Sequence, residues 1–146
     1  MFKKIILLII LFGTVFASNK QKVILITGTA YGIGKSTAEL LIDKGHIVYG
    51  GDILVEENLY LNDIGGTALE MDVTNQEHID KAVNQIISEQ GRVDVLVNNA
   101  GLGVYGAIED VSMEDIYYQY DVNLFGLARV TKAVLPYMRE KESGTI

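Results

Sequence analysis

The chain has 146 residues, of which 49% are hydrophobic, and it carries a formal net charge of −7. It contains no cysteine, which excludes disulfides and thiolate metal sites. No basic stripe follows any expected helix, and His46 and His78 have no second nitrogen ligand at metal spacing, so we expect neither a nucleic-acid partner nor a bound metal.

The first 17 residues have the pattern of a targeting segment. Lys3 and Lys4 precede an apolar stretch, and a small-residue cleavage site ends at Ala17. The stretch over residues 5–17 is shorter than the ~20 residues that a membrane-spanning helix needs. This favours a cleaved signal peptide, and secretion or delivery to the periplasm or an organelle lumen. A membrane anchor, with residues 1–17 in contact with the bilayer, is the alternative. Residues 18–146 then suit one domain.

A glycine-rich turn follows the first expected strand. The apolar run over residues 23–27 predicts a buried strand, and residues 33–44 have a helical pattern that ends before Gly45. Glycines between a strand and a helix let a pyrophosphate approach the backbone and the free N–H groups of the helix. We therefore expect a dinucleotide phosphate at this turn, with Tyr31 and Ile33 lining it through their backbones; the expected residues are Gly28, Tyr31, Gly32, Ile33 and Gly34.

An acidic residue follows the second expected strand, residues 47–51. Asp52 lies 18 residues past Gly34, where a carboxylate can hold an adenosine ribose through its hydroxyls. A carboxylate at this place repels the 2′-phosphate of NADP, and the next residue, Ile53, offers no positive charge to bind it. We therefore expect NAD as the cofactor rather than NADP.

Strands and helices continue to alternate along the rest of the chain. A short helix is expected over residues 56–63, a strand over 68–71, and a helix that a capping box at Thr74 opens and Gly91 ends. A strand over 93–97 comes next, and then a long helix from a cap at Ser112 to about residue 141, which Pro136 should kink or end. Alternation of this kind predicts an α/β fold, a doubly wound parallel sheet of Rossmann type with strand order 3-2-1-4.

Four motifs in this order resemble the short-chain dehydrogenase/reductase family. They are the Thr-Gly-x-x-x-Gly-x-Gly turn, the pair Asp72-Val73, the run Asn98-Asn99-Ala100-Gly101, and Asn123 within Val-Asn-Leu-Phe-Gly. The resemblance extends over residues 22–146 and implies a hydride transfer between a nicotinamide cofactor and a small alcohol or carbonyl substrate. Close relatives often carry an arginine at about the place of Ile53, so this residue departs from the pattern.

The resemblance also implies roles for individual residues. Asp72 would lie near the adenine amino group and Val73 beside the ring, although Asp72 could also serve only as a helix cap. The backbone of Asn99, Ala100 and Gly101 would run beside the cofactor's ribose. The last helix, which carries Tyr117, Tyr118 and Tyr120, often packs against a partner subunit in the family, so we expect a homo-oligomer of the full-length protein and core or subunit contacts for these tyrosines.

The family's catalytic set is an Asn, a Ser, a Tyr and a Lys, of which Asn123 is the only member that these 146 residues match. Tyr137 and Lys141 have the Tyr-x-x-x-Lys spacing, as do Tyr31 and Lys35, but we interpret both pairs as coincidental. We therefore expect an N-terminal fragment that stops before strand five, with residues 18–146 alone marginally stable because the fourth strand becomes an uncovered edge.

Two other functions compete with an oxidoreductase. The first is a catalytically inactive remnant that binds a dinucleotide or a partner. The second is a P-loop nucleotide hydrolase, suggested by Lys35 and Ser36 after Gly34, but five residues rather than four separate Gly28 from Gly34. Because free NAD is chiefly intracellular, a cytoplasmic location also stays open beside the one that the targeting segment suggests.

Overall fold

A computed structural model describes residues 21–146, so the targeting segment lies outside the described residues. Four strands form one parallel sheet in the order β3-β2-β1-β4, as the alternation of elements predicts. The strands are β1 (Val23–Thr27), β2 (Ile47–Asp52), β3 (Thr67–Glu70) and β4 (Val95–Val97). The helices are α1 (Gly32–Asp43), α2 (Val55–Asn58), α3 (Tyr60–Asp63), α4 (Gln76–Gln90), α5 (Met113–Tyr120), the π-helical segment η1 (Asp121–Gly126) and α6 (Leu127–Glu140).

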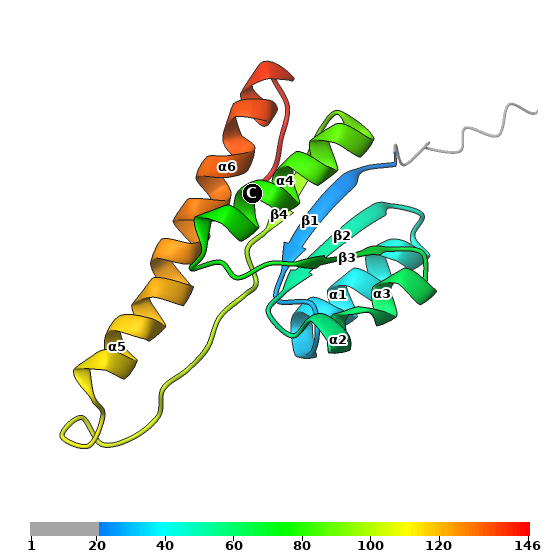
Figure 1. Ribbon diagram of the computed structural model, residues 1–146. Coiled ribbons are helices and arrows are strands. Elements are labelled where there is room, and N and C mark those ends of the chain that lie inside the picture. Colours follow the sequence, from blue (N-terminus) through cyan, green and yellow to red (C-terminus); the bar gives the residue numbers. More distant parts are fainter. Residues whose placement is uncertain (1–20) are drawn as a thin grey trace, which may run out of the picture.

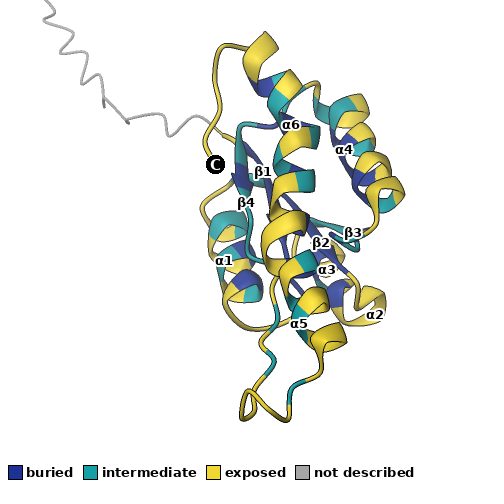
Figure 2. Ribbon diagram, turned by 90° about the vertical axis from the view of Figure 1, so that its left-hand side faces the viewer, coloured by how far each residue is buried: buried dark blue, intermediate teal, exposed yellow. Residues whose placement is uncertain are grey.

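Helices cover both faces of the sheet (Figure 1). Every residue of β1 is buried, and its side chains alternate between two cores. Val23 and Leu25 pack into a large cluster with α4 and α6, whereas Ile24 and Ile26 pack with residues of α1 and α3 on the other face. Figure 2 shows the buried sheet between the exposed outer surfaces of these helices. The sequence of β1 therefore reads as one apolar run because both of its faces are covered.

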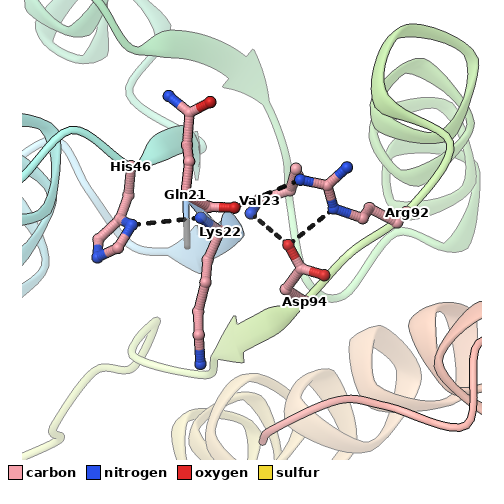
Figure 3. A network of polar contacts seen from close by, with 6 residues as sticks. All are labelled: Gln21, Lys22, Val23, His46, Arg92 and Asp94. Carbon is pink, nitrogen blue, oxygen red and sulfur yellow. Dashed lines mark hydrogen bonds and ion pairs between the residues drawn. The ribbon is translucent and has the colours of Figure 1, made fainter. Parts of the chain in front are cut away.

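The fourth strand is shorter than predicted and begins at Val95 instead of residue 93. Ahead of it, Asp94 bonds to β1 through its backbone as well as its side chain, because its N–H donates to the Val23 carbonyl at 2.8 Å. The Asp94 carboxylate accepts a hydrogen bond from the Val23 N–H at 2.7 Å and pairs with Arg92 at 2.9 Å (Figure 3). At the far edge of β4, Thr145 forms a parallel bridge with Val95. The beginning of a fifth strand at Thr145 is thus present.

Two further local predictions differ from the structure. Residues 56–63 form two short helices, α2 and α3, instead of one. The cap of α4 is Asn75, one residue later than expected, because its side chain accepts hydrogen bonds from the N–H groups of Glu77 and His78. The Thr74 hydroxyl instead donates to Asp72 at 2.7 Å.

Within residues 21–146, no helix has the length and apolar character needed to cross a membrane.

The last helix is irregular at a different place from the one predicted. It continues through Pro136 to Glu140, and its π-helical segment lies at residues 121–126. Pro136 removes one hydrogen bond to the carbonyl of Lys132, and both residues are exposed, so water can satisfy that carbonyl. The π segment has no proline, and π turns inside α-helices are often found at functional sites.

One buried tyrosine makes the stability of the fold sensitive to alkaline pH. Tyr49 is 1% exposed and donates a hydrogen bond to Glu89 at 2.6 Å. Burial, together with this bond, raises the pKa of Tyr49 to about 12. An unfolded tyrosine ionises near pH 10, so the stabilisation is fully present below pH 10 and is lost as the pH rises through 12. Two pKa units correspond to about 2–3 kcal/mol.

We therefore expect the free energy of unfolding to fall between pH 10 and pH 12, and to fall less steeply in Tyr49→Phe. Urea denaturation at several pH values measures this slope. Tyr105→Phe is the matched control, because Tyr105 is 93% exposed and should leave the slope unchanged. Equal slopes in the wild type and Tyr49→Phe would contradict the expectation.

Candidate functional site

A cavity of about 410 Å³ opens at the edge of the sheet where the parallel strands end. β1 lies between β2 and β4 in this sheet, so the chain crosses to opposite sides of β1, and such a switch point is where open α/β sheets bind ligands. Of the residues predicted to bind the cofactor, all but Gly32 and Gly34 line the cavity. The lining is Gly28, Ala30, Tyr31, Ile33, Asp52, Ile53, Leu54, Met71, Asp72, Val73, Asn99, Ala100, Gly101, Leu102, Tyr118 and Val122.

The glycine-rich turn brings backbone close to this cavity. Gly28 has φ +76°, a conformation that favours glycine, and a Cβ there would lie 2.8 Å from the Cα of Ala100. Gly34 is buried in the first turn of α1, and a Cβ there would overlap the carbonyl oxygen of Gly28 and the side-chain amide of Asn99. Gly34 therefore lets α1 pack directly on the turn, behind the cavity wall rather than in it.

The amino end of α1 has no side-chain cap. Its N-cap residue is Tyr31, whose side chain makes no capping hydrogen bond and which lines the cavity. The first N–H groups of a helix lack partners inside the helix, and together with the helix dipole they favour an anion. An uncapped helix end beside a cavity is a suitable place for a pyrophosphate.

Asn99 fastens the end of β4 to the turn after β1. Its side-chain amide donates to the carbonyl oxygens of Thr27 and Gly28, each at 2.9 Å. The Thr27 hydroxyl accepts hydrogen bonds from the N–H groups of Asn99 and Ala100, each at 3.0 Å. Sequence reasoning missed Thr27 as a partner of Asn99, although it is the first residue of the glycine motif. The Asn99 side chain is thus occupied in holding the cavity walls together.

The Asp52 carboxylate is held by two backbone N–H groups, one from the glycine-rich turn and one from the residues that follow β2. It accepts hydrogen bonds from the N–H of Ala30 at 2.8 Å and the N–H of Leu54 at 3.0 Å, and the residue is 8% exposed. A carboxylate has about four lone-pair sites, so both oxygens can accept further hydrogen bonds. Among residues 21–146, no lysine, arginine or histidine lines the cavity, and Ile53 contributes an apolar side chain there.

Asp72 shapes a turn and lines the cavity, but it is not the cap of α4, which is Asn75. One carboxylate oxygen accepts hydrogen bonds from the Thr74 N–H at 2.8 Å and the Thr74 hydroxyl at 2.7 Å, which shapes the turn before α4. Asp72 also lines the cavity beside Val73, which is 6% exposed. Val73 packs against Gly126 of the π segment, where a Cβ would lie 2.7 Å from a Val73 methyl group.

Asn123 does not line the cavity itself, but it bonds to the backbone of Leu102, which does. Its side chain accepts a hydrogen bond from the Leu102 N–H at 2.9 Å and donates one to the Leu102 carbonyl at 2.7 Å. Val122 and Tyr118 of the same helix do line the cavity, and sequence reasoning assigned neither to the site. Helical spacing places residues four apart on one face, but it does not indicate that this face meets the cavity.

The three tyrosines of α5 do not belong to the core. Tyr117, Tyr118 and Tyr120 are 68%, 48% and 54% exposed, so the prediction that they belong to the core is wrong.

Neither Tyr-x-x-x-Lys pair assembles at the cavity. Lys35 lies 4.2 Å from the ring of Tyr60, and Tyr137 packs against the large core cluster. Among residues 21–146 no group of three or more His, Asp or Glu side chains could hold a metal ion.

Comparisons with known proteins agree with this geometry. The model of a family described as "short chain dehydrogenase" matches residues 22–146. The chain is 49% identical over 128 residues to a 3-ketodihydrosphingosine reductase from Bacteroides thetaiotaomicron, covering 87% of this chain and 46% of that protein. It spans about half the length of the relatives that it matches.

Two solved structures superpose on the described fold. The 3-ketoacyl-(acyl-carrier-protein) reductase of Brucella melitensis, complexed with NADH, has a TM-score of 0.79 and 31% identity over 82% of this chain and 51% of its own. The alcohol dehydrogenase of Thermococcus sibiricus, complexed with 5-hydroxy-NADP, has a TM-score of 0.80 and 28% identity over 86% of this chain and 57% of its own.

Proposed function

Because this chain belongs to the short-chain dehydrogenase family, we propose that it forms the cofactor-binding half of an oxidoreductase acting on a secondary alcohol or ketone. The observation that carries the proposal is the cavity, in which the glycine turn, Asp52 and the Asn99 segment meet at the carboxyl edge of a parallel sheet. The bound nicotinamide dinucleotide would supply the hydride donor or acceptor. The protein's part is to bind and orient it.

The residues present fit such a dinucleotide. The uncapped start of α1 would hold the pyrophosphate, and the carboxylate of Asp52 would accept hydrogen bonds from the adenosine ribose. Asp72 and Val73 would contact the adenine, and the backbone of Ala100 and Gly101 would lie along the second ribose. The volume of about 410 Å³ falls within the range of small-molecule sites, which is ~300–1,000 Å³.

We propose NAD rather than NADP as the cofactor. Asp52 and Asp72 are the charged residues of the lining, and both are acidic. A 2′-phosphate beside Asp52 would place like charges within a few ångströms at a site that lacks a neutralising cation. The complexes of relatives include both NADH and an NADP derivative, so the preference has to come from the residues of this chain.

Fluorescence titration should show that NADH binds at least about 10-fold more tightly than NADPH, a difference of ~1.4 kcal/mol. The double variant Asp52→Ala/Ile53→Arg should reverse this order, because it removes the repelling carboxylate and adds a guanidinium that binds phosphate. Ile64→Arg is the matched control, since Ile64 is exposed after α3 and does not line the cavity. A wild-type preference for NADPH would refute the assignment.

For the substrate, we propose a ketone carried on a long apolar chain. The support is the 49% identical relative, whose name specifies 3-ketodihydrosphingosine, together with the apolar residues Leu102 and Val122 in the cavity. Asn123 is the one residue of this chain that matches the family's catalytic set. Oxidation of NADH in the presence of 3-ketodihydrosphingosine tests the activity in the native protein. Tight NADH binding without turnover on any ketone would favour the alternative, an inactive dinucleotide-binding protein.

We further propose that the protein self-associates through its last helix. Leu124, Phe125 and Leu127 are 51%, 53% and 43% exposed, and they follow the exposed tyrosines of α5 in sequence, in the segments η1 and α6. Apolar side chains gathered in this way favour a protein–protein contact.

A further inference from the structure

Two polar side chains beneath the glycine turn are completely buried. Thr29 and Asn58 are both 0% exposed, and the Thr29 hydroxyl donates a hydrogen bond to Asn58 Oδ1 at 2.8 Å. The Asn58 amide donates to the Gly50 carbonyl at 2.8 Å and approaches the Leu69 carbonyl at 3.5 Å. Asn58 is the last residue of α2, and one side chain therefore joins the glycine turn to β2 and β3.

The same part of the turn is held from two further directions. The Tyr60 hydroxyl donates to the Thr29 carbonyl at 3.1 Å, and the N–H of the next residue, Ala30, donates to the Asp52 carboxylate at 2.8 Å. The turn packs so closely on β2 that a Cβ on Gly50 would overlap the Thr29 hydroxyl, so the turn has little freedom to move toward this strand. The Asn58 bond to Gly50 thus fixes the turn relative to the strand that ends in Asp52.

We propose that Asn58 is a positioning residue for cofactor binding, acting through Thr29. This inference rests on the proposed function. The Asn58 side chain bonds to Thr29, which precedes Ala30, and to Gly50, two residues before Asp52. Through these bonds it would fix the distance between the phosphate turn and the ribose carboxylate. A site whose backbone is ordered before the ligand arrives loses less conformational freedom on binding.

Packing alone does not explain an asparagine at this position. Leu61 of the small core cluster is also 0% exposed and lies, like Thr29, beside Gly50, whose carbonyl accepts the Asn58 bond. An apolar side chain of similar size would suit such a buried place. A buried amide is favourable only when its hydrogen bonds are made, and Asn58 makes them on both its oxygen and its nitrogen. Its bonds run to the turn and to the strand before Asp52, which is what a positioning role requires.

The test compares the full chain with Asn58→Leu, Thr29→Val and the double variant. NADH dissociation constants are measured by fluorescence on folded protein, and urea denaturation reports stability separately. Each single variant should weaken NADH binding about 10-fold, and the double variant should be no weaker than the worse single one, because both changes remove the same link. Asn62→Ala is the matched control: Asn62 is exposed on α3, accepts a hydrogen bond from Ala68, and should leave NADH affinity unchanged.

Three results would contradict the positioning role of Asn58. If both single variants lose stability but keep the wild-type NADH dissociation constant, Asn58 is only structural and the inference fails alone. If the effects of the two changes add in the double variant, they do not act through one link. If the wild-type chain binds neither NADH nor NADPH, the proposed function fails, and this inference fails with it. Should Asn58→Leu not fold, the nearly isosteric Thr29→Val carries the comparison.

Discussion

Gly34→Ala is expected to abolish measurable NADH binding, with a loss of at least about 100-fold in affinity, or ~2.8 kcal/mol. The added Cβ would overlap the Gly28 carbonyl oxygen and the Asn99 amide, and neither is the free end of a flexible chain. The start of α1 must therefore move away from the turn. Because the phosphate would bind to N–H groups of both segments, even a small displacement separates its donors. Isothermal titration with NADH measures the loss.

Gly45→Ala is the control for this substitution. Gly45 also has a positive φ, +81°, but a Cβ there meets no atom within 4 Å, and Gly45 lies outside the cavity lining. It should cost about 1 kcal/mol of stability through backbone strain and leave NADH affinity intact. If Gly34→Ala binds NADH as the wild type does, the turn and the helix do not hold the phosphate together.

Asn99→Leu should lower the free energy of unfolding by about 2–4 kcal/mol and weaken NADH binding in parallel. The substitution leaves the Thr27 and Gly28 carbonyls without the donor that each now has at 2.9 Å. An unsatisfied buried backbone group costs ~1–3 kcal/mol. The loss also separates the end of β4 from the turn after β1, so the two cavity walls lose their fixed spacing.

Urea denaturation and NADH titration of Asn99→Leu measure the two effects together. Gln76→Ala serves as the comparison, because the Gln76 amide bonds only to the exposed Asp80 one turn away, at 2.8 Å. It should change stability by less than about 0.5 kcal/mol. An Asn99→Leu variant as stable as the wild type would show that the bonds to Thr27 and Gly28 are not net stabilising.

The sheet was predictable because its signal is local and repeated. Each strand is an apolar run followed by a helical pattern, and right-handed crossovers leave few possible orders, so 3-2-1-4 follows from residues such as Val23 and Leu96 without knowledge of their contacts. The π segment was not predictable. Its sequence has helical propensity, and its distortion is associated with long-range contacts of Asn123 with Leu102 and of Gly126 with Val73.

The residues of the candidate site also differ in how far they could be predicted, according to whether their signal is local or long-range. Residues within recognisable motifs, such as Asp52 and Ala100, could be assigned from sequence, although their cofactor contacts stay predictions. Thr27 could not be linked to Asn99, nor Thr29 to Asn58, because the members of these pairs lie 72 and 29 residues apart and a buried polar pair has no periodic pattern. The α4 cap shows the same limit on a small scale, since Thr74 and Asn75 are both good caps and only the competing Asp72 bond decides between them.

The hydrogen-bonded network around Asp94 holds the place where the described chain enters the sheet. Arg92 donates to the Gln21 carbonyl at 3.4 Å (Figure 3). The Gln21 side chain donates to the Gly45 carbonyl at 2.9 Å, and the two bonds together hold the start of β1. Parallel strands begin at one edge of a sheet and end at the opposite one. Gln21 therefore lies at the edge of the sheet opposite the cavity, and whatever precedes it is joined to the described domain at that edge. The proposed cofactor would enter at the other edge, where the strands end.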